Sequence, residues 1–304
     1  MKLFVSGLIN VETNLRIRSF PVTYYPIDYP FFGIKSTVSG VGYNISKAAK
    51  TLGDEVTFSS LIGRDHEARR VVHALEDSGI DRSYVFDSLD TTPVSVVLYE
   101  PGEAGRRQIY CDLKDVQERK TDIERVKPAI YASDMCVLCN VNYNRELLGI
   151  AKAAGKPIAT DVHVLSDIHD PFNSDFMRAA DILFLSDEDI PSGPQEFLTE
   201  LKNEYSAKII VMGLGSEGAV LYEREKDGIS FVRAVSIGGV VNTVGAGDAM
   251  FTAFLHYYGN GMNAIEALKR AQAFAALKIR HDGGSVGFST EEQVEEVYRT
   301  YKFD

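Results

Sequence analysis

The chain has 304 residues, a length between one large domain and two ordinary ones. Its apolar share of 45% and charged share of 25% are those of an average globular protein, which excludes a collagen-like or intrinsically disordered chain. The formal net charge of −11 provides no basic field to attract a phosphate backbone, so we expect no nucleic acid partner.

The lack of a recognisable secretory signal and the few cysteines predict a protein of a reducing compartment. The first ten residues hold an apolar run too short for a secretory signal, and no stretch approaches the roughly 20 apolar residues of a membrane span. Three cysteines, an odd number, favour reduced thiols: Cys111, Cys136 and Cys139. The last two form a C-x-x-C inside an apolar strand, which favours structural thiols over a redox pair. We therefore predict a cytoplasmic protein with no membrane partner.

The predicted elements alternate between strand and helix from about residue 55 onward. Short β-branched runs predict strands, and amphipathic segments between them predict helices. In chain order these are strand 56–62, helix 66–77, strand 135–139, helix 144–154, strands 157–161 and 182–185, helix 195–205 and strand 208–212. The alternation predicts right-handed βαβ units and a mostly parallel sheet covered by helices.

Two stretches interrupt this alternation. Residues 15–35 are rich in Tyr, Phe, Ile and Pro, and residues 92–110 are predicted to form two strands around a Gly-containing loop at 101–105. Both are predicted to be β insertions on an α/β core. Because the chain shows no internal repeat and no Pro/Ser-rich linker, we expect a single domain over residues 1–304 with a small β appendage.

A glycine motif at 213–218 matches the dinucleotide fingerprint G-x-G-x-x-G letter for letter. That fingerprint needs a helix after it and an acid about 20 residues further on. Here residues 219–222 are predicted to form another strand, and Arg233 stands near the position of the acid. The sequence therefore favours a Gly-rich turn between two strands, where the backbone can approach a ligand closely.

The segment 238–251 carries the strongest signal. Apolar residues at 251, 254, 255 and 258 follow a helical period, so a helix is predicted to begin within Gly245-Ala246-Gly247-Asp248. Small residues there expose backbone N–H groups at a helix N-terminus, which favours an anion, and Asp248 lies close enough to accept the proton of an attacking hydroxyl. Alternatively, Asp248 caps the helix and the glycines permit tight packing. The segment alone leaves both interpretations open.

A second group of residues lies near the N-terminus. Residues 39–44 are expected to precede a helix that runs to Leu52, and residues 7–12 to end the first strand. Ligands of doubly wound sheets bind outside the carboxyl ends of the strands. Glycines, a carboxylate and an amide meet there and suit a polyhydroxylated ligand: Glu12, Gly40, Gly42 and Asn44. A glycine-rich turn with a capping Asn is the alternative.

Together these segments resemble the two signatures of the ribokinase-like (PfkB) carbohydrate kinase family. Residues 242–248 match D-T-x-G-A-G-D at every letter but the first, and residues 39–44 match G-G-x-G-x-N at every letter but Ser39. No Walker or protein-kinase motif is present. The resemblance covers essentially the whole chain and implies a three-layer αβα core, a central mostly parallel sheet and a small β-sheet lid at about 11–36 and 92–112.

The resemblance also implies an ATP- and Mg²⁺-dependent kinase that phosphorylates a hydroxymethyl group of a sugar or sugar-like molecule. In that family pattern Asp248 is the base, and the N–H groups of Gly245, Ala246 and Gly247 form the anion hole. Glu12, Gly40, Gly42 and Asn44 then bind the acceptor; Ser186, Gly213, Gly215, Ser216 and Gly218 bind the nucleotide; Glu188 and Asp189 serve the metal indirectly; and Asn242 and Val244 mark a monovalent cation (K⁺) site. A homodimer through the lid is the implied assembly.

Besides Ser39, several positions depart from the family pattern, and Asp161-Val162-His163 stands where many members have D-x-N. Ser186 stands for Asn, Asp189 for Glu, Gly213 for Thr and Asn242 for Asp. The last change weakens a potassium site. These departures motivate a non-catalytic sugar or nucleotide sensor as one alternative.

A nucleoside kinase, including the pseudouridine type, is another alternative, because lid aromatics can stack on a base: Tyr24, Tyr25, Tyr29, Phe31 and Phe32. A phosphosugar acceptor is a further alternative if Arg106 or Arg107 faces the site, although their position in a hairpin equally suits a solvated face. The sequence leaves the acceptor itself open, because specificity depends on the lid and a few side chains.

Overall fold

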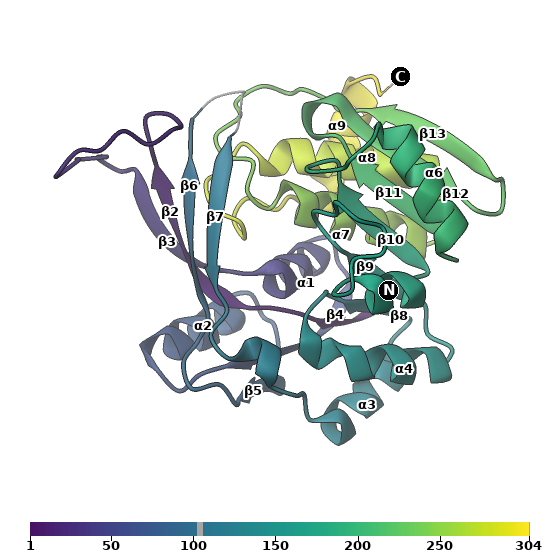
Figure 1. Ribbon diagram of the computed structural model, residues 1–304, viewed down its shortest axis with the longest axis horizontal. Helices are drawn as coiled ribbons and strands as arrows, with labels where there is room; N and C mark the ends of the chain where they lie inside the picture. Colours follow the sequence, from purple (N-terminus) through teal and green to yellow (C-terminus); the bar gives the residue numbers. More distant parts are fainter. Residues whose placement is uncertain (102–105, 304) are drawn as a thin grey trace.

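The computed structural model describes residues 1–101 and 106–303, and two sheets form its frame (Figure 1). The larger sheet has the order β13-β12-β11-β10-β9-β8-β1-β4-β5, and the smaller has the order β3-β2-β6-β7, over the described residues. The strands are β1 Lys2–Ser6, β2 Asn10–Arg16, β3 Ile34–Ser39, β4 Glu55–Ile62, β5 Tyr84–Asp87, β6 Val94–Tyr99, β7 Arg107–Asp112, β8 Met135–Leu138, β9 Ile158–Asp161, β10 Ile182–Ser186, β11 Ile209–Gly213, β12 Gly218–Glu223 and β13 Gly228–Arg233.

In the large sheet the neighbouring strands β5, β4, β1, β8, β9, β10 and β11 run parallel to one another. Strands β12 and β13 add an antiparallel hairpin at the edge beside β11. Successive side chains of these strands are buried on opposite faces. In β1, for example, Leu3 and Val5 join the core of one face, whereas Phe4 joins the core of the other. Continuous apolar strands of this kind need cover on both sides, which the helices supply.

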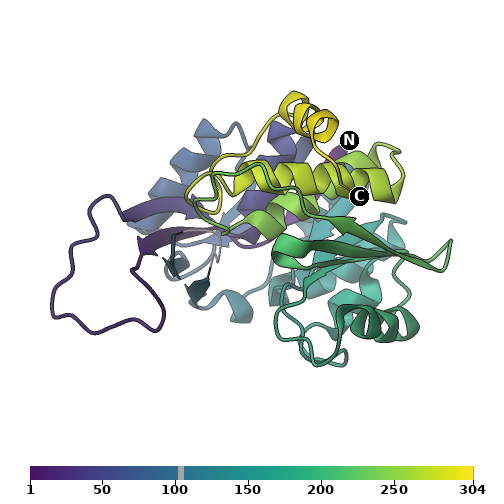
Figure 2. The same ribbon diagram turned by 90° about the horizontal axis from the view of Figure 1, so that it is seen from above.

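Helices cover both faces of the large sheet, as Figure 2 shows with the yellow-green helices on one side and the teal helices on the other. Helices α1, α2, α7, α8 and α9 supply the core of the first face, and α3 to α6 supply the cores of the second. Their bounds are α1 Val41–Thr51, α2 His66–Asp77, α3 Ile123–Ala132, α4 Arg145–Ala153, α5 Ser174–Ala179, α6 Pro194–Glu204, α7 Ala246–Gly259, α8 Ala264–Lys278 and α9 Glu291–Thr300. The predicted three-layer arrangement with a small separate sheet is confirmed.

The small sheet is the predicted lid. Its strand β2 pairs antiparallel with β3 and parallel with β6, and β6 pairs antiparallel with β7. The prediction of a β insertion over 15–35 was largely wrong: residues 17–33 contain no strand and form a long loop that projects from the body (Figure 2). Its Pro residues and its exposed side chains account for the absence of pairing. The loop predicted at 101–105 falls mostly on residues 102–105, which lie outside the described residues.

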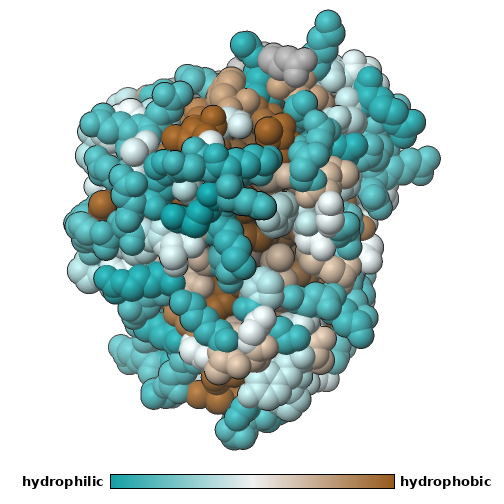
Figure 3. Space-filling model, turned by 90° about the vertical axis from the view of Figure 1, so that its right-hand side faces the viewer, coloured by the Kyte–Doolittle hydropathy of each residue, from teal (hydrophilic) through white to brown (hydrophobic). Residues whose placement is uncertain are grey.

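Polar side chains cover most of the molecular face in Figure 3, and apolar side chains emerge between them. This pattern agrees with the charged share of the sequence, because charged side chains are mostly exposed on the surface of a folded protein. Among residues 1–101 and 106–303, no helix has the length and apolar character that crossing a membrane requires.

Candidate active site

The N-terminus of α7 lies where the sequence predicts a helix start. Gly245 is the N-cap, with a left-handed φ of 79°. A Cβ at this position would lie 2.4 Å from the carbonyl oxygen of Gly284, so only glycine fits. Ala246 already donates its N–H to Thr243 O at 3.1 Å. Of the three predicted anion-hole donors, Gly245 and Gly247 are therefore the two that the geometry favours.

Asp248 lies in the first turn of α7 and is buried. Its Oδ2 accepts a hydrogen bond of 2.7 Å from Nδ2 of Asn44, and Asn44 Oδ1 in turn accepts from Ser39 Oγ at 3.2 Å. This contact joins the two signature segments, which are about 200 residues apart in the sequence. The amide fixes the carboxylate so that its other oxygen, Oδ1, can be directed to a ligand.

Burial raises the pKa of Asp248 to about 6. His163 and the hydrogen bond from Asn44 oppose that rise, whereas the nearby carboxylates of Asp161 and Glu12 add to it. A carboxyl group with a pKa near the operating pH is well suited to accept a proton during a reaction. The electrostatics therefore favour the interpretation of Asp248 as a base over that of a plain helix cap.

The α1 segment differs slightly from the prediction. The helix begins at Val41, so Gly42 and Asn44 lie in its first turn rather than before it. A Cβ at Gly42 would come within 2.6 Å of the backbone of Gly7, which explains the glycine as a close approach between α1 and the end of β1. Gly40 precedes the helix with φ 104°. Both glycines thus allow the start of α1, which carries Asn44, to pack closely on the backbone of residues 7–9.

Glu12 was predicted to end the first strand, and this was wrong. That strand stops at Ser6, and Glu12 lies within the lid strand β2, which begins separately at Asn10. Its Oε1 nevertheless faces the site: it accepts from Asn14 Nδ2 at 2.9 Å and from Gly284 N at 3.2 Å. Glu12 is buried, and its charge is close enough to Asp248 to add to the rise that burial causes in the pKa of that carboxyl group.

The lid face beside Glu12 carries buried polar groups. Strand geometry places Asn10, Glu12 and Asn14 on one face of β2, and Thr37 of β3 pairs with Glu12. Two buried atoms on this face, Asn10 Oδ1 and Thr37 Oγ1, have no hydrogen-bond partner among the described residues. Buried polar atoms without partners are costly unless a ligand or water satisfies them. This face therefore suits a ligand with several hydroxyl groups.

The segment after α8 completes the site, and the sequence analysis missed it. Asp282 accepts from Asn242 Nδ2 at 3.0 Å and from the hydroxyl of Tyr99 at 3.2 Å. Gly284, as described above, contacts Glu12, and the buried Lys278 at the end of α8 donates to Val244 O at 2.8 Å. The Gly-Gly pair at 283–284, in the loop after α8, was the available signal that a backbone comes close to a ligand here.

The predicted nucleotide-side residues meet at the carboxyl ends of β10 and β11. Ser186 and Gly213 are paired in the parallel register, and Asp187 N donates to Gly213 O at 3.0 Å. The chain then turns through residues 215–217 into β12, with Gly215 and Gly218 both at positive φ. The prediction of a turn between two strands, instead of a dinucleotide fold, is confirmed. Ser216 lies within this turn.

Acidic side chains gather beside this turn. The pKa of Asp187 is raised by burial and by the nearby charges of Glu188 and Glu217. Glu188 and Asp189 are both exposed, and Glu188 Oε1 lies 3.3 Å from Nη2 of Arg107 on the lid. No group of three or more metal-ligating side chains occurs in the part of the chain that the structure describes. Mg²⁺ bound mainly through phosphate and water needs only one or two carboxylates, and this cluster meets that need.

The two lid arginines have different surroundings. Arg106 binds Glu100 within the lid, with Nε at 2.9 Å from Oε2. Arg107 points across to the core, where its Nη1 lies 3.4 Å from the hydroxyl of Thr243, two residues before the anion-hole glycine. Arg107 is therefore the arginine that faces the site.

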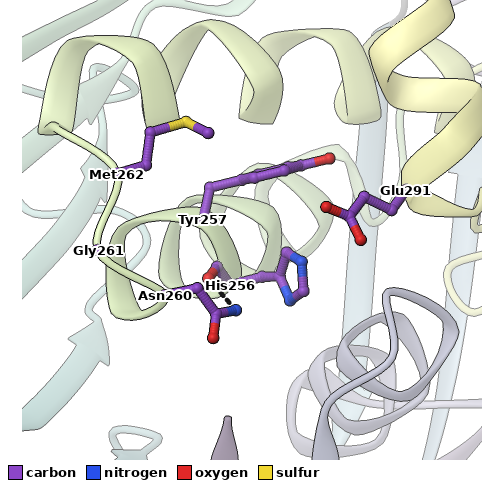
Figure 4. Close-up of a pocket in the computed structure, with 6 residues that line it drawn as sticks. All are labelled: His256, Tyr257, Asn260, Gly261, Met262 and Glu291. Atoms are coloured by element: carbon purple, nitrogen blue, oxygen red, sulfur yellow. Dashed lines mark hydrogen bonds between the residues drawn. The ribbon is translucent and has the colours of Figure 1, made fainter.

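A separate pocket lies at the far end of α7 (Figure 4). It has a volume of about 470 Å³ and is lined by His256, Tyr257, Asn260, Gly261, Met262 and Glu291. Asp54 Oδ2 lies 2.8 Å from Nδ1 of His256, and Asn260 donates to His256 O at 2.8 Å. Because Asp248 sits at the opposite end of the same helix, this pocket is distinct from the predicted site.

The cysteines agree with a structural role. Cys136 and Cys139 are buried and free, and burial raises the pKa of both thiols. A thiol with a raised pKa is a poor nucleophile and a poor redox group. Cys111 is free and exposed.

The chain is similar to known proteins along most of its length. The chain is 23% identical over 281 residues to the 2-dehydro-3-deoxygluconokinase of Bacillus subtilis, covering 84% of this chain and 85% of that protein. The structure of a microbiome-derived acarbose kinase matches with a TM-score of 0.85 at 25% identity, over 98% of both chains. That of Arabidopsis thaliana ribokinase complexed with ribose and ATP matches with a TM-score of 0.79 at 19% identity, over 99% of both chains. Residues 14–291 match the model of the pfkB family carbohydrate kinases, so the chain belongs to this family and is a sugar kinase.

Proposed function

We propose that this sugar kinase transfers the γ-phosphoryl group of ATP to a hydroxymethyl oxygen of its acceptor, with Asp248 as the base. One observation carries the proposal: the buried Asp248 carboxylate is held by Asn44 directly beside a helix start that only glycine can form. A fixed base next to a group of N–H donors is the arrangement that phosphoryl transfer requires.

The proposed step uses two kinds of group at the start of α7, the Asp248 carboxylate and the backbone N–H donors. Asp248 Oδ1 accepts the proton of the acceptor hydroxyl as its oxygen forms the new bond to the γ-phosphorus, and the bond to the leaving oxygen of ADP breaks. Because charge develops on the transferred group, the N–H groups of Gly245 and Gly247 stabilise it at the positive end of the α7 dipole. Mg²⁺, held with the phosphates near Glu188 and Asp189, would offset the charge of the nucleotide.

Acceptor and nucleotide are assigned to opposite sides of Asp248. We assign the acceptor to Glu12, Gly40, Gly42 and Asn44, together with Asn10, Asn14 and Thr37 on the lid face. Ser186 and the turn from Gly213 to Gly218 are assigned to ATP. The lid face offers the partnerless atoms Asn10 Oδ1 and Thr37 Oγ1, which hydroxyl groups of a sugar can satisfy.

A sugar acid is the acceptor class that we propose. The relative from Bacillus subtilis is named for a 2-dehydro-3-deoxy sugar acid. Arg107 extends from the lid to Thr243, and a guanidinium at the edge of the site suits a carboxylate. The lid aromatics give the nucleoside alternative little support, because the side chains of Tyr24, Phe31 and Phe32 are exposed on the projecting loop.

A panel of acceptors with Mg-ATP tests this proposal. ADP release should depend on added 2-dehydro-3-deoxygluconate, and ribose, fructose and inosine should support less turnover. ADP release with inosine alone would instead favour the nucleoside kinase. Ligand binding without turnover across the whole panel would contradict the proposed step.

We also propose that the chain forms a homodimer through the lid. Large apolar side chains are exposed on the projecting loop and on strands β6 and β7 of the lid: Val22, Tyr24, Tyr25, Ile27, Tyr29, Phe31, Phe32, Val96, Ile109 and Tyr110. An exposed apolar group of this extent is typical of an association surface. Sedimentation velocity should show a dimer that the substitution Phe32→Asp weakens, whereas a monomer at all protein concentrations would contradict the proposal.

A further inference from the structure

A fully buried lysine, Lys278, lies against the loop of residues 242–245 that leads into α7. We call this loop the anion-hole loop. Lys278 is the last residue of α8, and its side chain has no exposed surface. Its Nζ donates to the carbonyl oxygen of Val244 at 2.8 Å. A buried ammonium is strongly unfavourable unless nearby acceptors and charges compensate it, so its place here requires a reason.

Three carboxylates supply that compensation. The charges of Asp248, Glu12 and Asp282 each raise the pKa of Lys278, and burial outweighs them, so that the pKa is lowered to about 8. The C-terminal end of α8 adds the negative end of a helix dipole. The Lys278 ammonium is thus an internal cation between these three carboxylates and the loop that leads into α7.

The same loop holds Asn242 and Val244, the two residues at which the family resemblance implies a monovalent cation. In the structure the carbonyl of Val244 binds the Lys278 ammonium. The side chain of Asn242 donates to Asp282 at 3.0 Å through Nδ2 and accepts from Val244 N at 3.0 Å through Oδ1. Both groups are engaged by the protein, and a second cation at Val244 would be repelled by the ammonium. These residues do not fit an exchangeable potassium ion.

We propose that the Lys278 ammonium acts as a built-in cation that fixes the anion-hole loop and makes the enzyme independent of potassium. Lys278 is a positioning residue: it contacts the Val244 carbonyl, and Gly245, the proposed N–H donor, follows directly. The inference rests on the proposed role of this helix start in phosphoryl transfer. A loop displaced by about 1 Å can cost about 100-fold in rate even when the altered residue is remote from the reacting atoms.

Two substitutions distinguish the effect of the positive charge of Lys278 from the effect of its side-chain volume. Lys278→Met replaces the ammonium by an apolar chain of similar volume, and Lys278→Ala leaves a cavity that K⁺ or NH₄⁺ can enter. Assays compare potassium chloride, ammonium chloride and tetramethylammonium chloride at equal ionic strength. Lys152→Met is the matched control, because this exposed lysine also lies in the last turn of a helix and donates to a carbonyl, Arg178 O at 2.9 Å.

The wild type should have the same kcat in all three salts. Lys278→Met should lose up to about 100-fold in kcat, with a smaller change in KM for the acceptor, and no salt should restore it. Lys278→Ala should recover part of its kcat in K⁺ or NH₄⁺ only. Lys152→Met should resemble the wild type. Activation of the wild type by potassium, or full activity of Lys278→Met, would overturn the proposal.

Thermal unfolding provides a readout that needs no turnover. The melting temperature of Lys278→Ala should rise in K⁺ or NH₄⁺ relative to tetramethylammonium, because an ion that binds only the native state stabilises it. The melting temperatures of the wild type and Lys278→Met should not differ among the salts. A potassium-dependent melting temperature of the wild type would contradict the built-in cation. Failure of the proposed kinase step would leave this result unaffected, so the two failures are distinguishable.

Discussion

The substitution Asp248→Asn should lower kcat by about 10²- to 10⁴-fold, the range that a positioned general base contributes. The amide is nearly the same size as the carboxylate and still offers an oxygen to Asn44, but it does not accept the acceptor's proton. ATP binding should be unchanged. Steady-state kinetics with the best acceptor, together with calorimetric titration of the nucleotide, provide the measurement.

Stability should distinguish this loss from a folding defect. The raised pKa of Asp248 means that the ionised carboxylate is less stable in the native state than in the unfolded chain. A neutral amide at this position should therefore not lower the melting temperature. Asp54 is the matched control, a buried aspartate beside the other end of α7 that binds His256 and the Met1 ammonium. Asp54→Asn should lower the melting temperature and leave kcat nearly unchanged. The reverse pattern would remove Asp248 from the chemistry.

The same carboxyl group sets an expected pH profile. Since only the ionised form accepts a proton, kcat/KM should fall as the pH drops through about 6, the raised pKa of Asp248. An unperturbed aspartate would place this fall near its ordinary value of 3.8. A profile that stays flat down to pH 4.5 would contradict the assignment of Asp248 as the base.

The substitution Gly245→Ala should have the second large effect. Its Cβ would lie 2.4 Å from Gly284 O, and the left-handed φ of 79° adds strain of about 1–3 kcal/mol for a residue with a side chain. Either the start of α7 or Gly284 must shift, and Gly284 also binds Glu12. Because the anion-hole donors move, kcat should fall by about 10²- to 10³-fold, with a lower melting temperature.

Gly149→Ala is the control for this glycine. It lies within α4, and a Cβ there meets no atom within 4 Å. Alanine should raise stability by about 1 kcal/mol through its helix propensity and leave kcat unchanged. Full activity of Gly245→Ala would show that the start of α7 does not place the transferred phosphoryl group.

The fold was predictable where the sequence period is strong. Helix α2 occupies 66–77, as predicted, because its apolar positions recur with a regular helical spacing. The start of α7 was predictable for the same reason, together with its glycines. The long loop at 17–33 was not: its Tyr, Phe and Ile residues have strand composition, but no neighbouring strand pairs with them.

The site was predictable only in part. Asp248, Asn44 and Glu12 carry recognisable chemistry in short motifs, and the structure brings them together. Lys278 shows no such signal, because a lysine in the last turn of a helix is ordinary on a surface. Its burial depends on how α8 packs against the loop before α7, and a single sequence does not reveal such a long-range contact.

Product analysis of the reaction with γ-labelled ATP tests the central claim most directly. With the best acceptor of the panel, phosphorus NMR and mass spectrometry should find the labelled phosphoryl group on the hydroxymethyl oxygen of the acceptor. One ADP should form per product, and Asp248→Asn should yield neither product nor ADP above background. Release of labelled inorganic phosphate without a phosphorylated acceptor, or undiminished product from Asp248→Asn, would contradict the account.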